Sequence, residues 1–210
     1  YKSPNGIPVL IGLEDISLSN DDLKALCAAF GTTSASPMLH IKGHTPEGEL
    51  PSTQDAISTT IMPNDLLNLW QNFNTGNNKI DLVAIGSPHA STAECMKFLK
   101  LLLEKNQTVI VPTILTVGRE TLGKLRDQGN LNQLSKLGVQ VVPDICWCSI
   151  TEPVFPSKTQ SLITNSGKYA HYGEGLTGRN IRFGSLSDCA MAALSGFVND
   201  ELPNWLNFNT

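Results

Sequence analysis

The sequence predicts an α/β fold in layers, with mainly parallel strands covered by helices. Apolar runs of strand length alternate along the chain with segments of helical periodicity, which is the pattern of parallel sheets covered by helices. The 210 residues are 40% hydrophobic and 16% charged, which is the composition of a globular protein rather than a disordered one. A chain of this length can bury a sizeable core.

Six short segments have the composition of buried strands, because they are rich in Val, Ile or Leu and too short for buried helices. These predicted strands are residues 37–41, 80–85, 108–111, 139–142, 161–164 and 181–183.

The helices have readable starts and apolar faces. Ser91 followed by Glu94 predicts a capping box, and the apolar residues after it recur at steps of three and four along one face. Gly196 suits the left-handed position after a helix end. Besides the helix after Ser91, we expect helices at about 21–30, 64–73, 119–128 and 131–136, and one from Ser185 or Ser187 to Gly196. In the first of these, the buried face would consist of Leu23, Leu26, Cys27 and Phe30.

The turn-rich segment NTGNNK at 74–79 is the most joint-like part of the chain and predicts lobes at 1–75 and 76–210, although a loop inside one domain has the same composition. The chain begins at Tyr1 without a Met, so we expect a piece of a longer protein.

Charge and cysteine usage exclude several classes of partner. The net charge is −4 and no run of Lys or Arg occurs, which argues against nucleic acid and anionic membranes and favours a small molecule. No apolar stretch approaches the ~18 residues of a membrane span. Five cysteines, an odd number, predict free thiols in a reducing compartment, so we expect a cytoplasmic protein.

Candidate site residues follow the predicted strands, where open α/β sheets bind ligands. Ser87 and His89 lie in a turn after the strand at 80–85, and His89 would position substrate or transfer a proton. The structural alternative is that the turn residues only shape the connection to the helix.

Two thiols, Cys146 and Cys148, follow the strand at 139–142, and Cys189 falls in the first turn of a helix, where the helix dipole stabilises a thiolate. All three are candidate iron ligands. Buried free thiols are common, however, and structural zinc prefers a second close cysteine pair, which this sequence lacks.

The segment TNSGKYAHYG reads as a donor-rich loop after the strand at 161–164. Its amide, ammonium and backbone N–H groups would hold an anionic substrate. The alternative is a solvated turn with a surface lysine. The candidate substrate-binding residues here are Asn165, Ser166, Lys168, Tyr169 and His171.

Several long motifs in the same order resemble the large subunit of the aconitase X family. They are LHIKGHTPEG, GSPHAST, DICWCSITEPVFP, TNSGKYAHYGEGLTGR and RFGSLSDC, so the resemblance runs from about residue 10 to the C-terminal end. It adds Thr45 of the T-P-E stretch to the substrate-binding candidates.

The resemblance implies an aconitase-like layered α/β/α fold and a hydro-lyase that dehydrates a small hydroxy acid. The C-W-C form looks more like the cis-3-hydroxy-L-proline branch than the mevalonate 5-phosphate branch. It also implies an iron or iron–sulfur centre with Cys146 and Cys189 as ligands, Cys148 as a further candidate and a third cysteine outside this chain. Lys168 and His89 would be catalytic.

The family pattern further implies that an N-terminal half of the large subunit and a small swivelling domain or subunit are partners of this chain. A metabolite-binding or assembly module without activity is the alternative. The departures from the pattern include Ile145, Glu174 and His44, and the segment 113–119 looks longer than its family equivalent.

Overall fold

The computed structural model describes residues 6–49 and 56–207, which form two compact units, Tyr1–Met62 and Pro63–Thr210. By its contacts the second unit begins with the helix α2 (Pro63–Phe73), and the lobe boundary predicted near residue 76 stays a prediction. Helix α2 packs on the second unit, where the Phe73 ring meets the Phe183 ring at a centroid distance of 5.8 Å.

In the described part of the first unit, residues 6–49 and 56–62, there are one helix and two very short strands. Strands β1 (Val9–Leu10) and β2 (His40–Ile41) pair in parallel, and the helix α1 (Asn20–Thr33) lies between them in the chain. Ser19 caps α1 through a capping box with Asp22. The strand predicted at 37–41 shrinks to two residues, and the face expected to be buried is only partly covered, with Cys27 exposed.

The second unit is built on a parallel sheet of five strands, which confirms the predicted fold class. The strand order is β5-β4-β3-β6-β7. The strands are β3 (Leu82–Ala90), β4 (Thr113–Val117), β5 (Val139–Pro143), β6 (Ser161–Thr164) and β7 (Asn180–Phe183).

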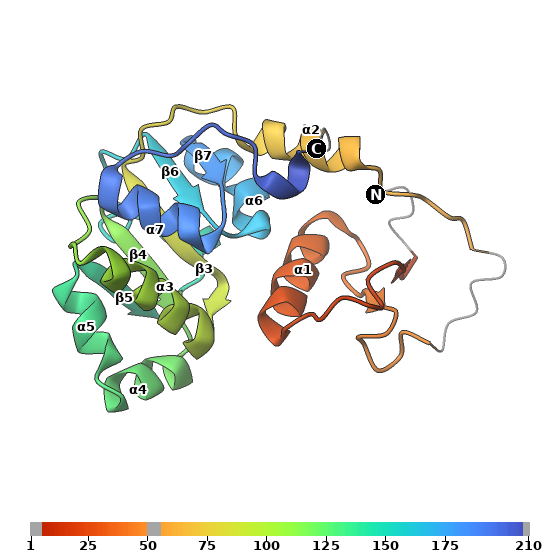
Figure 1. Cartoon of the computed structure of the whole chain (residues 1–210), viewed down its shortest axis with the longest axis horizontal. Coiled ribbons are helices and arrows are strands. Elements are labelled where there is room, and N and C mark those ends of the chain that lie inside the picture. The colour runs from red at the N-terminus through yellow and green to blue at the C-terminus, as the bar shows by residue number, and fades with distance from the viewer. Residues whose placement is uncertain (1–5, 50–55, 208–210) are drawn as a thin grey trace. The chain divides into compact units, whose positions relative to one another are not determined.

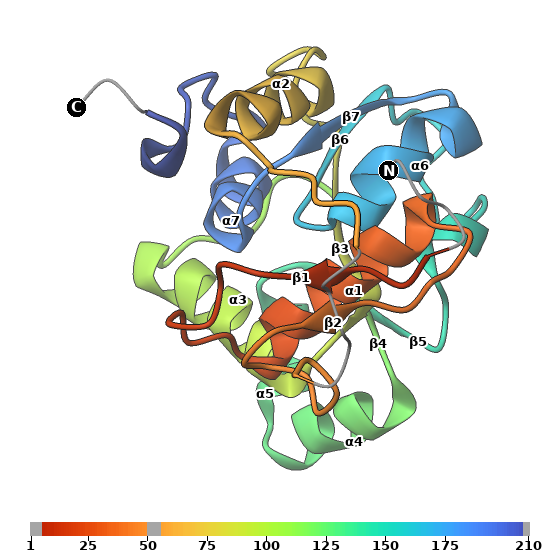
Figure 2. The same cartoon turned by 90° about the vertical axis from the view of Figure 1, so that its right-hand side faces the viewer.

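Helices cover both faces of this sheet and enclose two cores (Figure 1). The helices α3 and α7, with α4 and α5, enclose the first core, and α6, the short 3-10 helix η1 and α2 lie over the second. Figure 2 shows α6 and α7 on opposite sides of β6 and β7. The bounds are α3 (Thr92–Lys105), α4 (Arg119–Asp127), α5 (Asn130–Lys136), η1 (Trp147–Ser149), α6 (Gly167–Thr177), α7 (Leu186–Ser195) and a second 3-10 helix, η2 (Asn204–Leu206).

The predicted helix caps are present. Ser91 and Glu94 form the capping box of α3, and Gly196 follows α7 with a φ of 77°. Ser185, one of the two predicted starts, is the N-cap of α7.

The prediction of a strand at 108–111 is wrong. The backbone N–H of Val109 donates to the carbonyl of Leu137, and those of Ile110 and Val111 donate to the carbonyl of Ala193, so this segment bonds to the C-terminal ends of two helices instead of the sheet. The strand is β4, which begins after Pro112 and pairs with both β3 and β5. The segment 113–119, read from the sequence as an extension, thus forms a central strand and the start of α4.

Two site segments also differ from expectation. The glycine-rich segment after β6 is the helix α6, because Ser166 caps it and Tyr169, Ala170 and Gly173 pack into the core. Strand β3 continues through the predicted turn to Ala90. Among residues 6–49 and 56–207, the helices are all too short or too polar to cross a bilayer.

Candidate functional site

An irregularity in β3 shapes the carboxyl edge of the sheet. Ile85 pairs with Leu115 of β4, but the next pair is Ala90 with Val117, so residues 86–89 face the single residue Thr116. Gly86 makes this bulge possible, because its φ is 101° and a Cβ atom would lie 2.2 Å from the carbonyl oxygen of Thr116. The bulge turns Ser87 and His89 out of the regular pleat.

Ser166 connects this bulge to α6. Its hydroxyl donates to the carbonyl of Ser87 and accepts the backbone N–H of Tyr169 at 3.0 Å, which caps the helix. The N-terminus of α6, with Lys168 in its first turn, therefore lies against the bulge of β3. A helix N-terminus favours anions, so this corner suits a carboxylate.

The two thiols of the C-W-C segment lie beside this corner. Cys146 and Cys148 are half-buried, and their thiols are close enough to influence each other. Burial raises the pKa of the Cys148 thiol and the Cys146 thiol raises it further, whereas the ammonium of Lys168 opposes both effects. The net effect still favours the protonated thiol of Cys148, and Lys168 is close enough to reduce this preference.

Two buried hydroxyl groups face the same region. Ser87 is 3% exposed and Tyr169 is fully buried, and neither hydroxyl has a hydrogen-bond partner among the described residues. Burial, followed by the Cys148 and Cys146 thiols, raises the pKa of the Tyr169 phenol, which therefore stays protonated as a donor. Buried hydroxyls of this kind are available to a bound polar group.

His89 contacts the loop that carries the thiols. Its Nε2 atom lies 3.1 Å from the carbonyl oxygen of Ile145, so the ring donates from this nitrogen to the backbone next to Cys146. The sequence placed Ser87, His89, Cys146, Cys148, Ser166, Lys168 and Tyr169 at one sheet edge, and the structure brings these seven residues together.

Cys189 lies apart from the other two candidate ligands. It is 0% exposed and belongs to the core beneath α3 and α7, whereas Trp147, between the other two thiols, belongs to the core beneath α6. Burial raises the pKa of the Cys189 thiol, with Asp188 as a second cause, so the thiolate is disfavoured despite its place in a first helical turn. In the described part of the chain, no three His, Cys, Asp or Glu side chains are grouped to hold a metal.

The remaining three substrate-binding candidates are not among the seven residues that the structure brings together. Thr45 belongs to the first unit, where its hydroxyl accepts the backbone N–H of Ile41 at 2.9 Å and shapes a turn. His171 is exposed on α6 and its ring stacks near that of Tyr172. Asn165 is half-buried between β6 and α6.

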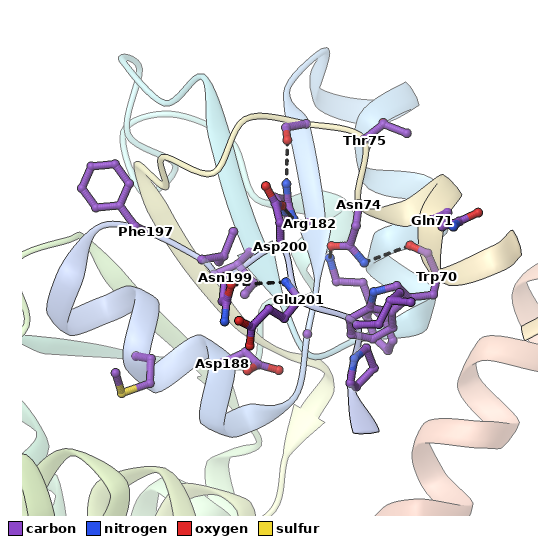
Figure 3. A pocket seen from close by; sticks show the side chains of 18 of the residues that line it. Trp70, Gln71, Asn74, Thr75, Arg182, Asp188, Phe197, Asn199, Asp200 and Glu201 are labelled. Carbon is purple, nitrogen blue, oxygen red and sulfur yellow. Dashed lines mark hydrogen bonds and ion pairs between the residues drawn. The ribbon is translucent and has the colours of Figure 1, made fainter. Parts of the chain in front are cut away.

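A hollow of about 1030 Å³ lies at another place, along α7 between α2 and residues 197–204 (Figure 3). Arg182 of β7 lines it, and its guanidinium donates to the carbonyl of Gly76, to Asn78 and to Asp200. Figure 3 shows Trp70 of α2 and Asn74, the residue after that helix, on the other side of the hollow from Asp188 of α7. Arg182 thus joins segments distant in the sequence, which is a structural role.

Sequence reasoning missed the residues that hold the site together. Trp147 donates from Nε1 to the carbonyl of Ile85 at 2.9 Å, and Thr116 donates to the carbonyl of Gly86 at 2.6 Å. In the C-W-C motif only the two thiols were considered. The Trp between them could have been predicted to be buried and to donate a hydrogen bond that fixes the loop.

Two family models match this chain. A family model described as the aconitase X third domain matches residues 80–195, and one described as the aconitase X second domain matches residues 1–71. The chain belongs to the aconitase X family.

Sequences of two dehydratases can be aligned with nearly all of this chain. It is 39% identical over 210 residues to cis-3-hydroxy-L-proline dehydratase of Hypocrea jecorina and 36% identical over 209 residues to that of Pseudomonas aeruginosa, with 96% of the chain covered in each case. It is 29% identical over 150 residues, 71% of the chain, to the phosphomevalonate dehydratase large subunit of Thermococcus kodakarensis, of which it covers 38%.

The crystal structure of Thermococcus kodakaraensis aconitase X in its holo form has a similar fold, with a TM-score of 0.75 and 26% identity over 83% of this chain and 44% of that one. The chain spans 35% and 36% of the first two relatives, so it corresponds to about a third of their length.

Proposed function

We propose that this chain forms part of the active site of a hydro-lyase that removes water from a small hydroxy acid, with cis-3-hydroxy-L-proline as the substrate. The observation that carries the substrate is the similarity to two cis-3-hydroxy-L-proline dehydratases, at 39% and 36% identity over 96% of the chain. The phosphomevalonate dehydratase large subunits are 27–30% identical over 71–88% of it. Mevalonate 5-phosphate is therefore the second candidate substrate.

The carboxylate of the hydroxy acid would bind at the N-terminus of α6. Lys168 and the backbone N–H groups of that first turn supply positive potential, and Asn165 precedes them. The buried hydroxyls of Ser87 and Tyr169 lack partners among the described residues and are available to the polar groups of a substrate. When a proton leaves the carbon next to the carboxylate, these donors would stabilise the negative charge that develops.

The thiols of Cys146 and Cys148 suit an iron or iron–sulfur centre, because they are adjacent, partly exposed and at the sheet edge where the carboxylate would bind. When bound, such a centre supplies Lewis-acid assistance to the departing hydroxyl group. Cys189 is fully buried in the other core, and its role as a ligand stays a prediction. We propose that a further ligand comes from outside this chain.

The test is a set of variants in the full-length protein. We expect Cys146→Ser to lose bound iron and dehydration of cis-3-hydroxy-L-proline, because a hydroxyl is a poor substitute for an iron-binding thiolate. Cys27→Ser changes an exposed thiol of the first unit and should alter neither. Unchanged iron content in Cys146→Ser would contradict the assignment of the ligand.

A parallel substrate panel separates the functions. Turnover of mevalonate 5-phosphate in preference to cis-3-hydroxy-L-proline would replace the proposed substrate with the second candidate. Binding of a hydroxy acid without any turnover by the iron-loaded protein would indicate a metabolite-binding module instead. We expect the 210-residue chain alone to fold but not to dehydrate either compound, since it covers about a third of its relatives.

A further inference from the structure

Side chains from three other elements bind consecutive carbonyl groups of the β3 bulge. The carbonyl of Ile85 accepts from Trp147 at 2.9 Å, that of Gly86 accepts from Thr116 at 2.6 Å, and that of Ser87 accepts from Ser166. The bulge is therefore a junction where η1, β4 and the start of α6 are fastened to β3.

The loop that carries the thiols is attached to β3 on both sides of Cys146. Before Cys146, the carbonyl of Ile145 accepts from His89 at 3.1 Å. After it, the indole of Trp147 donates to Ile85, is 1% exposed and packs on the Tyr169 ring at a centroid distance of 5.5 Å. Because both anchors lie on one strand, Cys146 has little freedom to move relative to the sheet edge.

We propose that His89 and Trp147 are positioning residues that hold Cys146 and Cys148 as a closely spaced dithiol. This inference rests on the proposed function, in which these thiols bind a metal centre. It gives His89 a role through the loop it holds, in place of proton transfer. Thr116 is fastened to the same bulge but not to the loop, so it belongs to the framework alone.

Phenylarsine oxide is a suitable probe, because its arsenic atom forms bonds to two thiol sulfurs and loses its oxygen, which leaves as one water with the two thiol protons. Arsenic undergoes no change in oxidation state. Tight binding requires two thiols held close together. Cys95 and Cys189 are fully buried, and the exposed Cys27 gives only a single-thiol adduct, which excess 2-mercaptoethanol removes. Cys146→Ala in the full chain defines the background.

We expect Trp147→Phe, which keeps an aromatic ring but removes the N–H donor, to weaken binding of the arsenical about fivefold or more, the factor that corresponds to one hydrogen bond. His89→Ala should have a similar effect, and His89→Gln should restore tight binding because its amide can donate to Ile145. Thr116→Val removes a hydrogen bond from the same bulge and should lower stability without changing the affinity for phenylarsine oxide.

Wild-type affinity in folded Trp147→Phe and His89→Ala would overturn the proposal, as would an equal loss of affinity in Thr116→Val. If Trp147→Phe does not fold, the His89 variants decide alone: no loss in His89→Ala, or no recovery in His89→Gln, is again a refutation. If the anchors behave as expected but Cys146→Ser keeps its iron in the full-length protein, the proposed ligand fails while the positioning role stands.

Discussion

The sharpest prediction concerns Gly86, the residue that allows β3 to bulge beside Thr116. An alanine there would adopt a φ of 101°, which L residues avoid, and its Cβ would lie 2.2 Å from the Thr116 carbonyl oxygen and 2.6 Å from the Thr116 hydroxyl oxygen. Backbone strain of this kind costs about 1–3 kcal/mol, and forcing an atom into a packed core costs about 1–3 kcal/mol more. We therefore expect Gly86→Ala to lower the free energy of unfolding by about 2–6 kcal/mol.

Urea unfolding followed by tryptophan fluorescence measures this change. Trp70, Trp147 and Trp205 are the three tryptophans of the chain and all lie in the second unit, so the signal reports on the unit that contains Gly86. Because a domain is stable by only about 5–15 kcal/mol, the midpoint should move clearly.

Gly123→Ala is the matched control for Gly86→Ala. Gly123 lies inside α4 with no atom near its Cβ position, so the added methyl group should raise stability by about 0.5–1 kcal/mol. If the free energy of unfolding of Gly86→Ala lies within about 1 kcal/mol of the wild-type value, Gly86 does not hold the strained and crowded position in the bulge.

Two further variants concern the N-cap of α3 and the interactions of Asp200 with Asn78 and Arg182. Ser91→Ala removes the hydroxyl that accepts the backbone N–H of Glu94 and should lower the free energy of unfolding by about 1 kcal/mol, whereas an unchanged urea midpoint would contradict the cap. Hydrogen bonds from Asn78 and then Arg182 lower the pKa of Asp200 in the folded protein below its ordinary 3.8. The ionised carboxylate therefore stabilises the fold above pH 3.8. This stabilisation is lost as the pH falls through the lowered pKa. In Asp200→Asn, the loss of stability over this acidic range should be smaller than in the wild type, and an equal slope in the two proteins would exclude Asp200 as its source.

Features that depend on neighbours in the chain were readable from the sequence. The capping box at Ser91 and the glycine after α7 involve residues a few positions apart, so the chemistry of the segment decides them. The alternation of strands and helices likewise predicted the parallel sheet.

Which apolar segment becomes a strand depends on the neighbouring strands it can pair with, and the local sequence pattern does not reveal them. Residues 108–111 and 113–117 are both short and apolar, yet only the second segment pairs with β3 and β5. The first is held by carbonyl groups of Leu137 and Ala193, which come from distant parts of the chain. Periodicity cannot distinguish two short apolar segments of this kind.

The glycine-rich segment became a helix for a similar reason. Gly173 carries no side chain, and a Cβ atom there would lie 2.1 Å from the end of Ile181, so the glycine allows α6 to approach β7 closely. Glycine weakens a helix when the helix is considered alone, and the packing of α6 on the sheet outweighs that cost here.

For the candidate site, the sequence by itself determined which chemical groups gather at the carboxyl edge of the sheet, because parallel strands end at the same edge and the residues that follow them are fixed by chain order. That reasoning brought Ser87, Cys146 and Lys168 to one place. Tertiary structure alone decided which residues hold them and where Cys189 lies. Trp147 binds Ile85 across 62 positions of sequence, and Cys189 enters the core on the other face. Such contacts depend on how helices pack on the sheet, which no local pattern specifies.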